Sequence, residues 1–471
     1  ILVALGAGIL FGSDVLNLWH FDNMGLVNHA ANLALVFILF HGGFGTLRSD
    51  LRAVALPAIG LATWGVVLTA LATFAVLYGV LRWDVQRALL LAAIISSTDA
   101  AAIFSILRRQ SLPQRLASTI EIESAANDPM AILLTVAAIE AITVGHAGWL
   151  GTAGLFVWKF TAAPLVGWFL ARGAIWLFRR LEPQDRGHYY VLSLGVVLGI
   201  YGLVEVMQAS GMLAVFVAGH VMGNRSFVHK QGVANFTSAL STVANICMFA
   251  LLGLQVFPSR WGTLWLDGLV LFLVITFLAR PMAVLVGTLG MGFPWRHRLF
   301  MAWAGLRGAV PIVLGTYPAA AGLAVGEEIF NLVFFGVLLS IGLQGSTLGV
   351  LARWLKLATP SRPKPLFNVE LVTMAESDFD LVVVDLPGPA GAQGPSLADL
   401  RLPAGAVIVL ITRGRDLVVP KGSTRLQGFD QVTTLAHARD HDAVRGILLD
   451  RFAAAILPAA ADDAPPSPSA A

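Results

Sequence analysis

Long apolar runs alternate with short polar segments along residues 1–357. A helix needs about 20 consecutive apolar residues to cross the hydrocarbon core of a bilayer, and most of these runs approach that length. The pattern therefore predicts an all-α polytopic membrane protein. Its twelve candidate spans lie at about residues 1–16, 26–44, 53–80, 88–107, 116–143, 150–178, 189–207, 211–223, 235–257, 264–290, 298–317 and 328–351.

Three of these runs are interrupted by polar residues or by helix breakers. The polar segment Ser96–Asp99 lies in the middle of the fourth run, and Gly305–Pro311 lies within the eleventh. In the fifth run Pro129 follows Asp128, and a proline displaces the carbonyl four residues earlier from the helical ladder. Broken helices in separate parts of a transporter indicate an ion site near the bilayer midplane.

The composition changes after Leu357. Residues 358–367 predict a Pro-rich linker, 368–456 predict a small soluble α/β domain, and 457–471, rich in Ala, Pro, Ser and Asp, predict a disordered tail. In the α/β domain the spacing of Ser396–Asp399 predicts a short capped helix, and residues 440–453 predict a second helix. The candidate strands are 369–374, 380–386, 406–412, 416–419 and 430–435.

Composition and charge support a membrane protein and predict its orientation. The mean hydropathy is +0.76 and 13% of the residues are charged, against about 25% in soluble globular chains. Basic residues gather in the loops after the second, fourth, sixth, eighth and tenth runs, which the positive-inside rule places in the cytoplasm. The end of the last run lies there too. Because the chain starts inside an apolar run, we expect a further segment before Ile1.

The net charge and the cysteine content exclude several classes of function. The net charge of +3 is scattered through loops, so we expect no nucleic-acid partner. A single cysteine, Cys247 within an apolar run, excludes a disulfide framework and a thiolate metal cluster.

Three carboxylates, Asp99, Glu123 and Asp128, lie inside the apolar runs. An ionised side chain at the centre of a membrane helix costs about 2.5–3.5 kcal/mol on insertion scales, so we expect these groups to serve a function. On a helix Ser124 and Asp128 lie four residues apart, as do Glu123 and Asn127, and the two pairs share a face. The alternative is an interhelical hydrogen-bond network that only holds helices together.

A carboxylate in this setting can exchange ions. Ser124 and Asp128 offer hard oxygen ligands to a dehydrated alkali cation, and Asn127 adds an amide without adding charge. Desolvation favours the protonated acid and a bound cation favours the ionised form, so proton and cation compete for the group. Arg307 is always charged and needs compensation, for which Glu123 and Asp99 are both candidates.

Three ordered segments carry a resemblance to a known family. Ser-Thr-Asp-Ala-Ala-Ala-Ile-Phe, Glu-Ser-Ala-Ala-Asn-Asp-Pro and Gly-Leu-Arg-Gly-Ala-Val-Pro resemble the signature segments of bacterial cation:proton antiporters of the NhaP type, and the match covers about residues 1–355. The resemblance implies a fold of thirteen spans with inverted repeats and two crossed discontinuous helices. It also implies electroneutral exchange, a homodimer and the bacterial inner membrane.

The resemblance also assigns roles to individual residues. Asp128 is the exchanged carboxylate and Asn127 its neutral companion. The remaining assignments are an alkali-cation site completed by Ser124, Asp99 and Thr98, and a structural ion pair between Glu123 and Arg307.

The chain departs from the family at one early position. Relatives usually carry an acidic residue before Gly-Gly, and this chain has His41 before Gly42 and Gly43. A histidine there changes the charge near the site, so His41 is a possible modulator of ion choice or pH response, or a packing residue.

The soluble domain resembles the TrkA-C (RCK-C) domain of potassium-conductance regulators. Ser396–Leu402, Ala406–Gly414 and Leu417–Pro420 carry the likeness, while the usual Gly-Asp appears as Phe429-Asp430. An antiporter with this appendage is most similar to the CvrA-type potassium/proton exchangers. The resemblance implies regulation by a small ligand, which the sequence does not identify.

These observations predict a transporter, not an enzyme, that exchanges K⁺ or Na⁺ for H⁺ and needs no resident cofactor. The appended domain favours K⁺. A cation channel gated by that domain is the alternative, although it would need a filter such as Thr-Val-Gly-Tyr-Gly, absent from the chain. An intramembrane aspartyl protease would use Asp99 and Asp128 as a dyad, but the Gly-x-Gly-Asp motif typical of that class is also absent.

Overall fold

The structure is a computed structural model of the chain. The residues that it describes are 2–19, 24–46, 48–99, 103, 107, 110–143, 149–181, 187–360, 378–387, 391–414 and 416–462. The chain divides into two compact units: a membrane unit of residues 1–225 and 232–360, and a C-terminal unit of residues 226–231 and 361–471.

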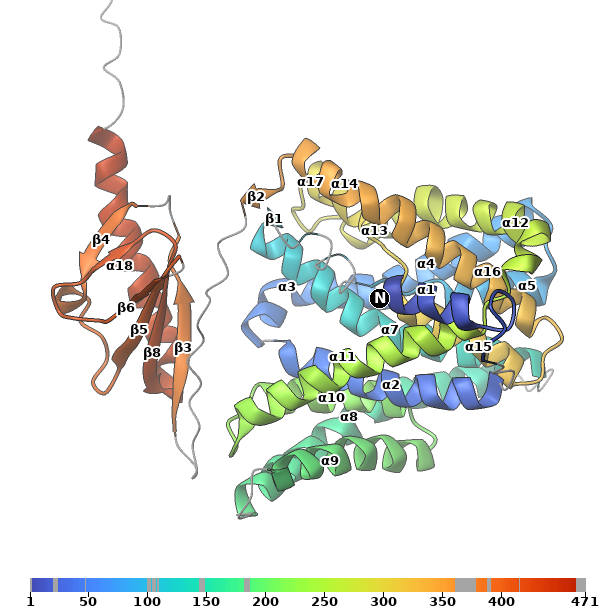
Figure 1. Cartoon of the computed structure of the whole chain (residues 1–471), viewed down its shortest axis with the longest axis horizontal. Coiled ribbons are helices and arrows are strands. Elements are labelled where there is room, and N and C mark those ends of the chain that lie inside the picture. The colour runs from blue at the N-terminus through green and yellow to red at the C-terminus, as the bar shows by residue number, and fades with distance from the viewer. Residues whose placement is uncertain are drawn as a thin grey trace, which may run out of the picture. The chain divides into compact units, whose positions relative to one another are not determined.

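The membrane unit is built from helices (Figure 1). Its first half contains α1 (Leu2–Phe11), α2 (Met24–Gly45), α3 (Arg48–Gly60), η1 (Leu61–Gly65), α4 (Val66–Phe74), η2 (Ala75–Val80), α5 (Val85–Ile94), α7 (Gln114–Thr143), α8 (Trp149–Arg180), α9 (Gly187–Val206), α10 (Gly211–Gly223) and α11 (Lys230–Leu254). Its second half contains η3 (Pro258–Arg260), α12 (Trp261–Val274), η4 (Ile275–Ala279), α13 (Arg280–Gly287), α14 (Trp295–Trp303), α15 (Ala309–Ala320), α16 (Gly326–Leu339), η5 (Ser340–Gly345) and α17 (Ser346–Trp354).

Eight helices in the described part of the chain are long and apolar enough to cross a membrane. Each corresponds to one of the predicted runs. The second of these eight helices, Val54–Val80, combines α3, η1, α4 and η2. The other four predicted runs contain shorter helices. Two of these runs are interrupted: α5 ends at Ile94, and α14 and α15 are separate pieces. The predicted count of twelve spans is therefore not confirmed.

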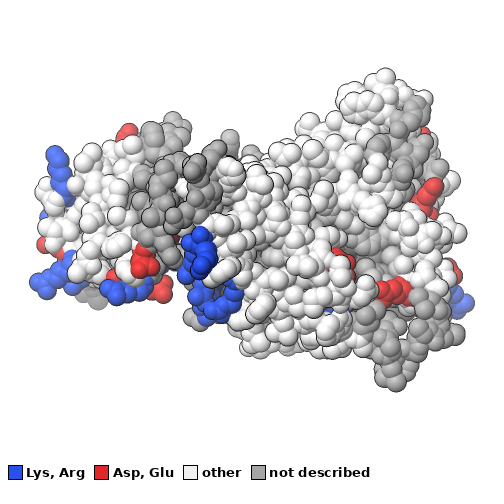
Figure 2. Space-filling view, turned by 90° about the horizontal axis from the view of Figure 1, so that it is seen from below, with Lys and Arg blue, Asp and Glu red and all other residues white. Residues whose placement is uncertain are grey.

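Uncharged surface covers the membrane unit as expected for contact with lipid. Large apolar side chains on the long helices are exposed, among them Trp64 at 72% and Phe169 at 70%. In the view of Figure 2 charged side chains are sparse over this unit. Exposed apolar residues on an otherwise well-packed helical bundle are what a bilayer environment requires.

Small residues allow α2 and α10 to pack at close range. A Cβ added at Gly223 would lie 2.9 Å from the Cα of Phe44, and one added at Gly219 would lie 3.0 Å from the backbone nitrogen of Phe44. Without a hydrophobic driving force between helices in lipid, such close backbone contact is a main source of association. The pair therefore forms a rigid part of the bundle.

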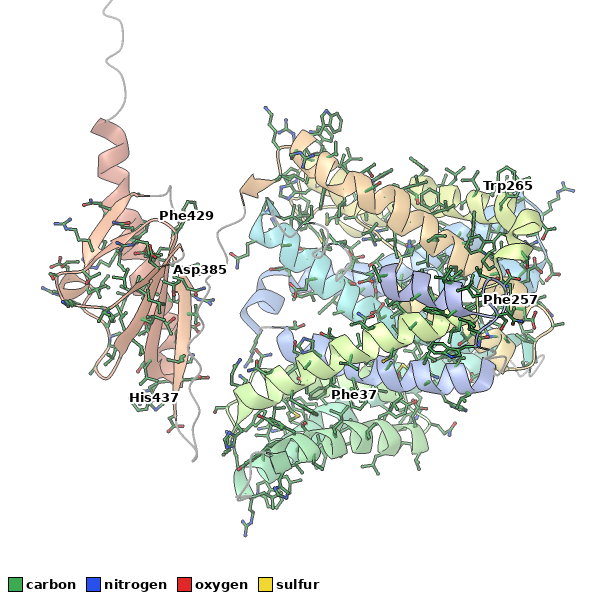
Figure 3. The ribbon with its side chains drawn as sticks, viewed as in Figure 1. Phe37, Phe257, Trp265, Asp385, Phe429 and His437 are labelled. Carbon is green, nitrogen blue, oxygen red and sulfur yellow. The ribbon has the colours of Figure 1, made fainter. Side chains whose placement is uncertain are left out.

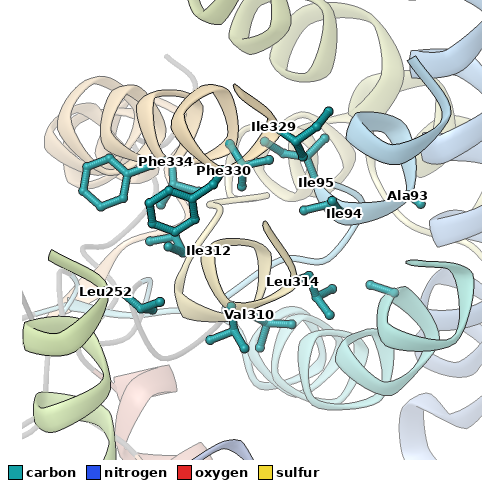
Figure 4. Packing of buried hydrophobic residues seen from close by; sticks show 14 of the residues in the cluster. Ala93, Ile94, Ile95, Leu252, Val310, Ile312, Leu314, Ile329, Phe330 and Phe334 are labelled. Carbon is teal, nitrogen blue, oxygen red and sulfur yellow. The ribbon is translucent and has the colours of Figure 1, made fainter. Parts of the chain in front are cut away.

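The centre of the membrane unit is a continuous apolar core around α15 (Figure 4). Val310, Ile312 and Leu314 of this helix pack among residues from α5, α11 and α16. Ile312, Leu314 and Phe330 are almost fully buried. Core packing of this density fixes the start of α15, and with it the loop that precedes it.

The C-terminal unit is a small α/β domain, as predicted. Its four-stranded antiparallel sheet has the order β3-β8-β5-β6, one face of which packs on helix α18 (His441–Asp462) through Val384, Val432, Leu448 and Phe452. The strands are β3 (Phe379–Asp385), β8 (Asp430–His437), β5 (Val407–Arg413) and β6 (Asp416–Val418).

The remaining strands form two small sheets. One pairs β4 (Gln393–Ser396) with β7 (Arg425–Gln427), and the other pairs β1 (Gln110–Ser111) with β2 (Thr359–Pro360) in the membrane unit. The sequence predicted neither β4 nor β7. In Figure 3, Asp385 and His437 mark opposite ends of the β3–β8 region, with Phe429 at the turn before β8.

Two predictions for the C-terminal region fall outside the described residues, and two others differ from the structure. The strand at 369–374 and most of the linker at 358–367 lie outside them. The short helix after Ser396 is a 3-10 turn, Leu397–Asp399. Helix α18 continues to Asp462, past the predicted end at 453 and into the segment predicted to be a disordered tail.

Candidate ion-binding site

The first interruption of an apolar helix lies directly after α5. This helix begins at the N-cap Asp84, whose carboxylate accepts hydrogen bonds from the backbone of Gln86 and Arg87, and it ends at Ile94. The following residues up to Asp99 leave the helical ladder, and the Asp99 N–H donates to the carbonyl of Leu306 at 2.8 Å. The polar segment therefore bonds to a distant part of the chain.

The second interruption separates α14 from α15. Residues 305–308 have no helical structure, and the segment lies against the first break. A Cβ added at Gly308 would lie 2.5 Å from Cγ of Asp99 and closer still to its Oδ2. Glycine at this position lets the Asp99 carboxyl group approach the backbone, so the two broken helices meet at Asp99 and Gly308.

Arg307 joins the two breaks. It is 2% exposed, and its Nη1 donates to the carbonyl oxygens of Ser96 at 2.9 Å and Ser97 at 2.5 Å. Its backbone N–H donates to Oγ of Ser340 at 3.1 Å. A cation just beyond the end of α5 meets carbonyls that the helix leaves unsatisfied and complements the negative end of the helix dipole.

The predicted oxygen ligands come from α7, which runs beside the crossing. Oγ of Ser124 donates to the Thr98 carbonyl at 2.8 Å. The Asn127 amide donates to Oγ1 of Thr98 at 2.7 Å, and its Oδ1 accepts the Thr98 N–H at 3.4 Å. These bonds fix Thr98 against α7 and bring Thr98, Ser124 and Asn127 together; their role in ion binding stays a prediction.

α7 itself is continuous from Gln114 to Thr143 with Pro129 inside it. The expected interruption at Pro129 is therefore wrong, although proline still removes one backbone donor from the ladder. Both real breaks contain several polar or glycine residues in succession, whereas a single proline is tolerated when neighbouring groups satisfy the freed carbonyl.

Asp128 projects from this continuous helix beside the crossing. Its Oδ1 is buried and accepts no hydrogen bond, and Asp99 is close enough to act on it electrostatically. An oxygen of this kind lacks the partners that a buried acceptor normally has. Asp128 therefore offers the free oxygen that a proton or a cation needs, one helical turn after Ser124 on α7.

Glu123 is paired with Arg280, not with Arg307. Nη1 and Nη2 of Arg280 reach Oε1 and Oε2 of Glu123 at 2.5 and 3.0 Å, and both side chains are almost fully buried. The predicted Glu123–Arg307 pair is wrong because Arg307 is committed to the carbonyls that follow α5. The bidentate geometry makes Glu123 a structural group.

An arginine before a proline in an apolar run is a partial signal for Arg280, but nothing in the sequence indicates its partner. Two polar residues of η5 were also missed: Ser340 donates to Gln344 at 2.6 Å, and Gln344 donates to the carbonyl of Trp303. They support the backbone of the second break. Polar residues inside a transmembrane run were the available signal.

His41 lies on α2, and its Nδ1 is buried without a hydrogen-bond partner. The helix packs against α7, α10 and α15. Within the described part of the chain, no hydrogen bond links this imidazole to the crossing. Its role as modulator stays a prediction.

The residues present suit an alkali cation. In the described parts of the chain, no three His, Cys, Asp or Glu side chains are grouped to hold a metal ion. The available oxygens belong to two carboxylates, hydroxyls and backbone carbonyls. Oxygens of these kinds are hard ligands, so the set suits a hard cation and not a soft transition metal.

Two interrupted helices that meet beside buried carboxylates, in a bundle of apolar helices, define a secondary ion transporter. The chain belongs to the sodium/hydrogen exchanger family: the family model described as "Sodium/hydrogen exchanger, transmembrane" matches residues 1–354. The predicted relation to NhaP-type cation:proton antiporters is thereby confirmed for the membrane unit.

Relatives match almost the whole chain. It is 35% identical over 451 residues to the K(+)/H(+) antiporter NhaP2 of Shewanella sp. (strain MR-4), with 95% of this chain and 78% of that protein covered. It is 32% identical over 451 residues to the K(+)/H(+) antiporter NhaP of Alkalimonas amylolytica, with the same coverage. Because the family model ends at residue 354, both alignments extend into the C-terminal unit.

A solved structure shares the fold. The sodium proton antiporter MjNhaP1 from Methanocaldococcus jannaschii at pH 8 matches with a TM-score of 0.66 at 24% identity, covering 75% of this chain and 91% of that one.

Proposed function

We propose that the protein exchanges an alkali cation for H⁺ by letting the two compete for Asp128. The observation that carries this proposal is the buried, unbonded Oδ1 of Asp128, which lies on α7 one helical turn after Ser124, the residue that bonds the Thr98 carbonyl. In a site of low polarity the carboxyl group is neutral with a proton or compensated by a cation. It cannot hold both, so movement of the loaded site in either direction completes an exchange.

The other groups of the site have supporting roles. Asn127 holds Thr98 in place, Asp99 adds a second acidic ligand, and Gly308 allows Asp99 to approach. Arg307 compensates charge at the crossing, and the Glu123–Arg280 pair holds α7 to the start of α13. The exchange is electroneutral because one monovalent cation replaces one proton.

K⁺ is the preferred cation in this proposal. The two relatives described above are named K(+)/H(+) antiporters, whereas the structural neighbour is named a sodium proton antiporter. A dye-based antiport assay in everted vesicles, comparing K⁺, Na⁺ and Li⁺ across pH, distinguishes the ions. The proposal predicts the largest signal with K⁺, and a response to Na⁺ alone contradicts this choice.

The central test is Asp128→Asn, which keeps the size of the side chain and removes its charge. We expect cation-driven proton movement in vesicles to fall to the level of vesicles without the protein. Asp14→Asn is the matched control, because Asp14 bonds Ser259 away from the crossing. If Asp128→Asn exchanges like the wild type, the mechanism is refuted.

Two wider features belong to the same proposal. A long helix, an interrupted helix and a long helix follow one another twice, from α3 to α7 and from α12 to α17, which supports the expected inverted repeat. We also propose thirteen spans in the full transporter, a homodimer and a location in the bacterial inner membrane. Crosslinking in native membranes tests the dimer.

We propose that the C-terminal unit is a cytoplasmic, TrkA-C-like regulatory domain that binds a small ligand. Its sheet order and its α18 are those of a compact independent fold. A chain ending at residue 357 should retain exchange but lose its response to cytoplasmic solutes. Single-channel current steps would instead support a gated channel, and cleavage of peptides by the pure protein would support a protease.

A further inference from the structure

A pocket of about 370 Å³ opens at one end of the membrane unit. It lies where α2 begins and where α7 and α15 end. At the opposite ends of these helices, Arg48 follows α2 and Arg115 lies in the first turn of α7. The positive-inside rule therefore places the pocket on the outer face. Its lining residues are Gly25, Asn28, His29, Val136, Ile139, Glu140, Tyr317, Ala320 and Ala321.

One face of α7 connects this pocket with the crossing. Asp128, Thr135 and Ile139 are spaced i, i+7 and i+11, so they lie on the same side of the helix over about 16 Å. Ile139 lines the pocket. Thr135 is 0% exposed, and its Oγ1 has no hydrogen-bond partner. An unsatisfied hydroxyl buried between the pocket and Asp128 is unusual in a packed core and indicates a path for a polar species.

Hydrogen bonds close the space between α2 and α15 at the base of the pocket. The Tyr317 hydroxyl donates to Oδ1 of Asn32 at 2.6 Å, and the Asn32 amide donates to Oδ1 of Asn28 at 2.9 Å. The Asn28 amide donates in turn to Oγ1 of Thr316 at 2.8 Å, a residue that is fully buried. This chain of side-chain bonds is a polar seam in an apolar bundle.

An acidic group lies at the rim. The Glu140 carboxylate binds Nζ of Lys159 on α8 at 2.9 Å and is still 35% exposed. A partly exposed carboxylate keeps solvated oxygen available, because its other lone pairs face water. Because Lys159 compensates the charge of Glu140, the rim offers a cation a solvated oxygen ligand and not a net negative charge.

We propose that this pocket is the outer mouth of the cation pathway and that the seam of Asn28, Asn32, Thr316 and Tyr317 seals it from Asp128. The mouth receives a hydrated alkali cation beside Glu140, and opening of the seam admits the ion along the Thr135 face of α7. This inference rests on the proposed exchange at Asp128. It adds the route by which the ion arrives.

Accessibility of engineered cysteines tests the route independently of transport. Cys247→Ser removes the native thiol, and Ala320→Cys or Thr135→Cys then places a thiol in the mouth or below the seam. In right-side-out vesicles, a membrane-impermeant thiol reagent should label Ala320→Cys and leave Thr135→Cys protected. Labelling of Ala320→Cys only from the inner side overturns the proposal.

Opening the seam should expose the buried position. We expect Tyr317→Phe, which removes only the hydroxyl, to raise the outer labelling rate of Thr135→Cys at least tenfold. Tyr78→Phe is the matched control, since Tyr78 stacks on Phe74 in a different part of the bundle. Equal rates for the two variants refute the seal. The labelling readout holds whether or not Asp128 carries the exchanged ion, so the two proposals fail separately.

The rim carboxylate is tested by transport. Glu140→Gln should raise the outer cation concentration for half-maximal exchange severalfold and leave the inner one unchanged. Glu328→Gln is the control, because Glu328 is also paired with a basic residue, Arg87, but does not line the pocket. No change with Glu140→Gln, or a change on the inner side, contradicts cation entry at this mouth.

Discussion

Gly308→Ala tests the meeting point of the two broken helices. The added methyl would lie 2.5 Å from Cγ of Asp99, whereas carbon atoms normally touch at about 3.5–4.0 Å, so the carboxyl group must move by about 1 Å or more. The added methyl would lie closer still to Cβ of Asp99, so rotation of the side chain alone cannot relieve the contact. The variant therefore displaces Asp99 as a whole and strains the bond from its N–H to the Leu306 carbonyl at 2.8 Å.

The size of the effect follows from the cost of overpacking. Such substitutions cost about 1–3 kcal/mol, and about 1.4 kcal/mol corresponds to a tenfold change in affinity. If the cost falls on the cation-loaded state, the half-maximal cation concentration rises by about fivefold to one hundredfold. The assay is exchange in everted vesicles as a function of cation concentration at fixed pH.

Gly315→Ala on the same helix is the matched control. A Cβ there would meet its nearest neighbour, the Cα of Phe330, at 3.5 Å, which is an ordinary contact. It should bind the cation like the wild type. The reasoning is refuted if Gly308→Ala shows unchanged cation affinity, or if both variants lose affinity equally.

Three further predictions concern buried charge, backbone strain and voltage. Arg280→Met should destabilise the protein by about 3–5 kcal/mol, because it leaves the buried Glu123 carboxylate without its counter-charge. Adding Glu123→Leu should recover most of this loss in thermal melts. The same Glu123→Leu change should not rescue Arg307→Met. Phe429 has a φ of 68°, a backbone conformation that favours glycine and disfavours β-branched residues. Phe429→Gly should therefore raise the unfolding temperature of the C-terminal unit, and Phe429→Val should lower it, in calorimetry of the full chain. A shift of the same sign in both variants contradicts backbone strain at this position. Exchange should proceed at one rate whether vesicles are clamped at zero or at a large potential, and a steep voltage dependence contradicts one-for-one exchange.

The sequence predicted which polar residues gather at the candidate site better than it predicted their partners. A polar segment or a carboxylate inside an apolar run is costly, so Thr98, Asp99 and Asp128 were predictable from residue type alone. The choice between two buried arginines was not, because Glu123 and Arg280 are 157 residues apart. Only packing decides which guanidinium reaches which carboxylate.

The same limit explains the helix count. Hydropathy averages over a window, so it reads 298–317 as one span, although α14 and α15 are separate pieces. The glycines on either side of Arg307 indicated a break but not its partner in space. Gly308 leaves space for the Asp99 side chain, which approaches from the other broken helix, and that neighbour is not visible in the local sequence.

The charges at the crossing explain why a carboxylate pair can work in the membrane. Three acidic and two basic side chains are involved: Asp99, Glu123, Asp128, Arg280 and Arg307. Glu123 and Arg280 cancel in their bidentate pair. In the proposed mechanism the charge of Arg307, which is bonded to backbone carbonyls, balances one of the two remaining carboxylates and leaves one acidic group without a fixed counter-charge. A proton neutralises that group, and so does a monovalent cation, so both loaded forms carry the same net charge through the low-dielectric interior. The empty, ionised form alone pays the cost of an uncompensated buried charge. The proposed mechanism therefore requires that the site moves only when loaded, and that restriction couples the two ions without any further device.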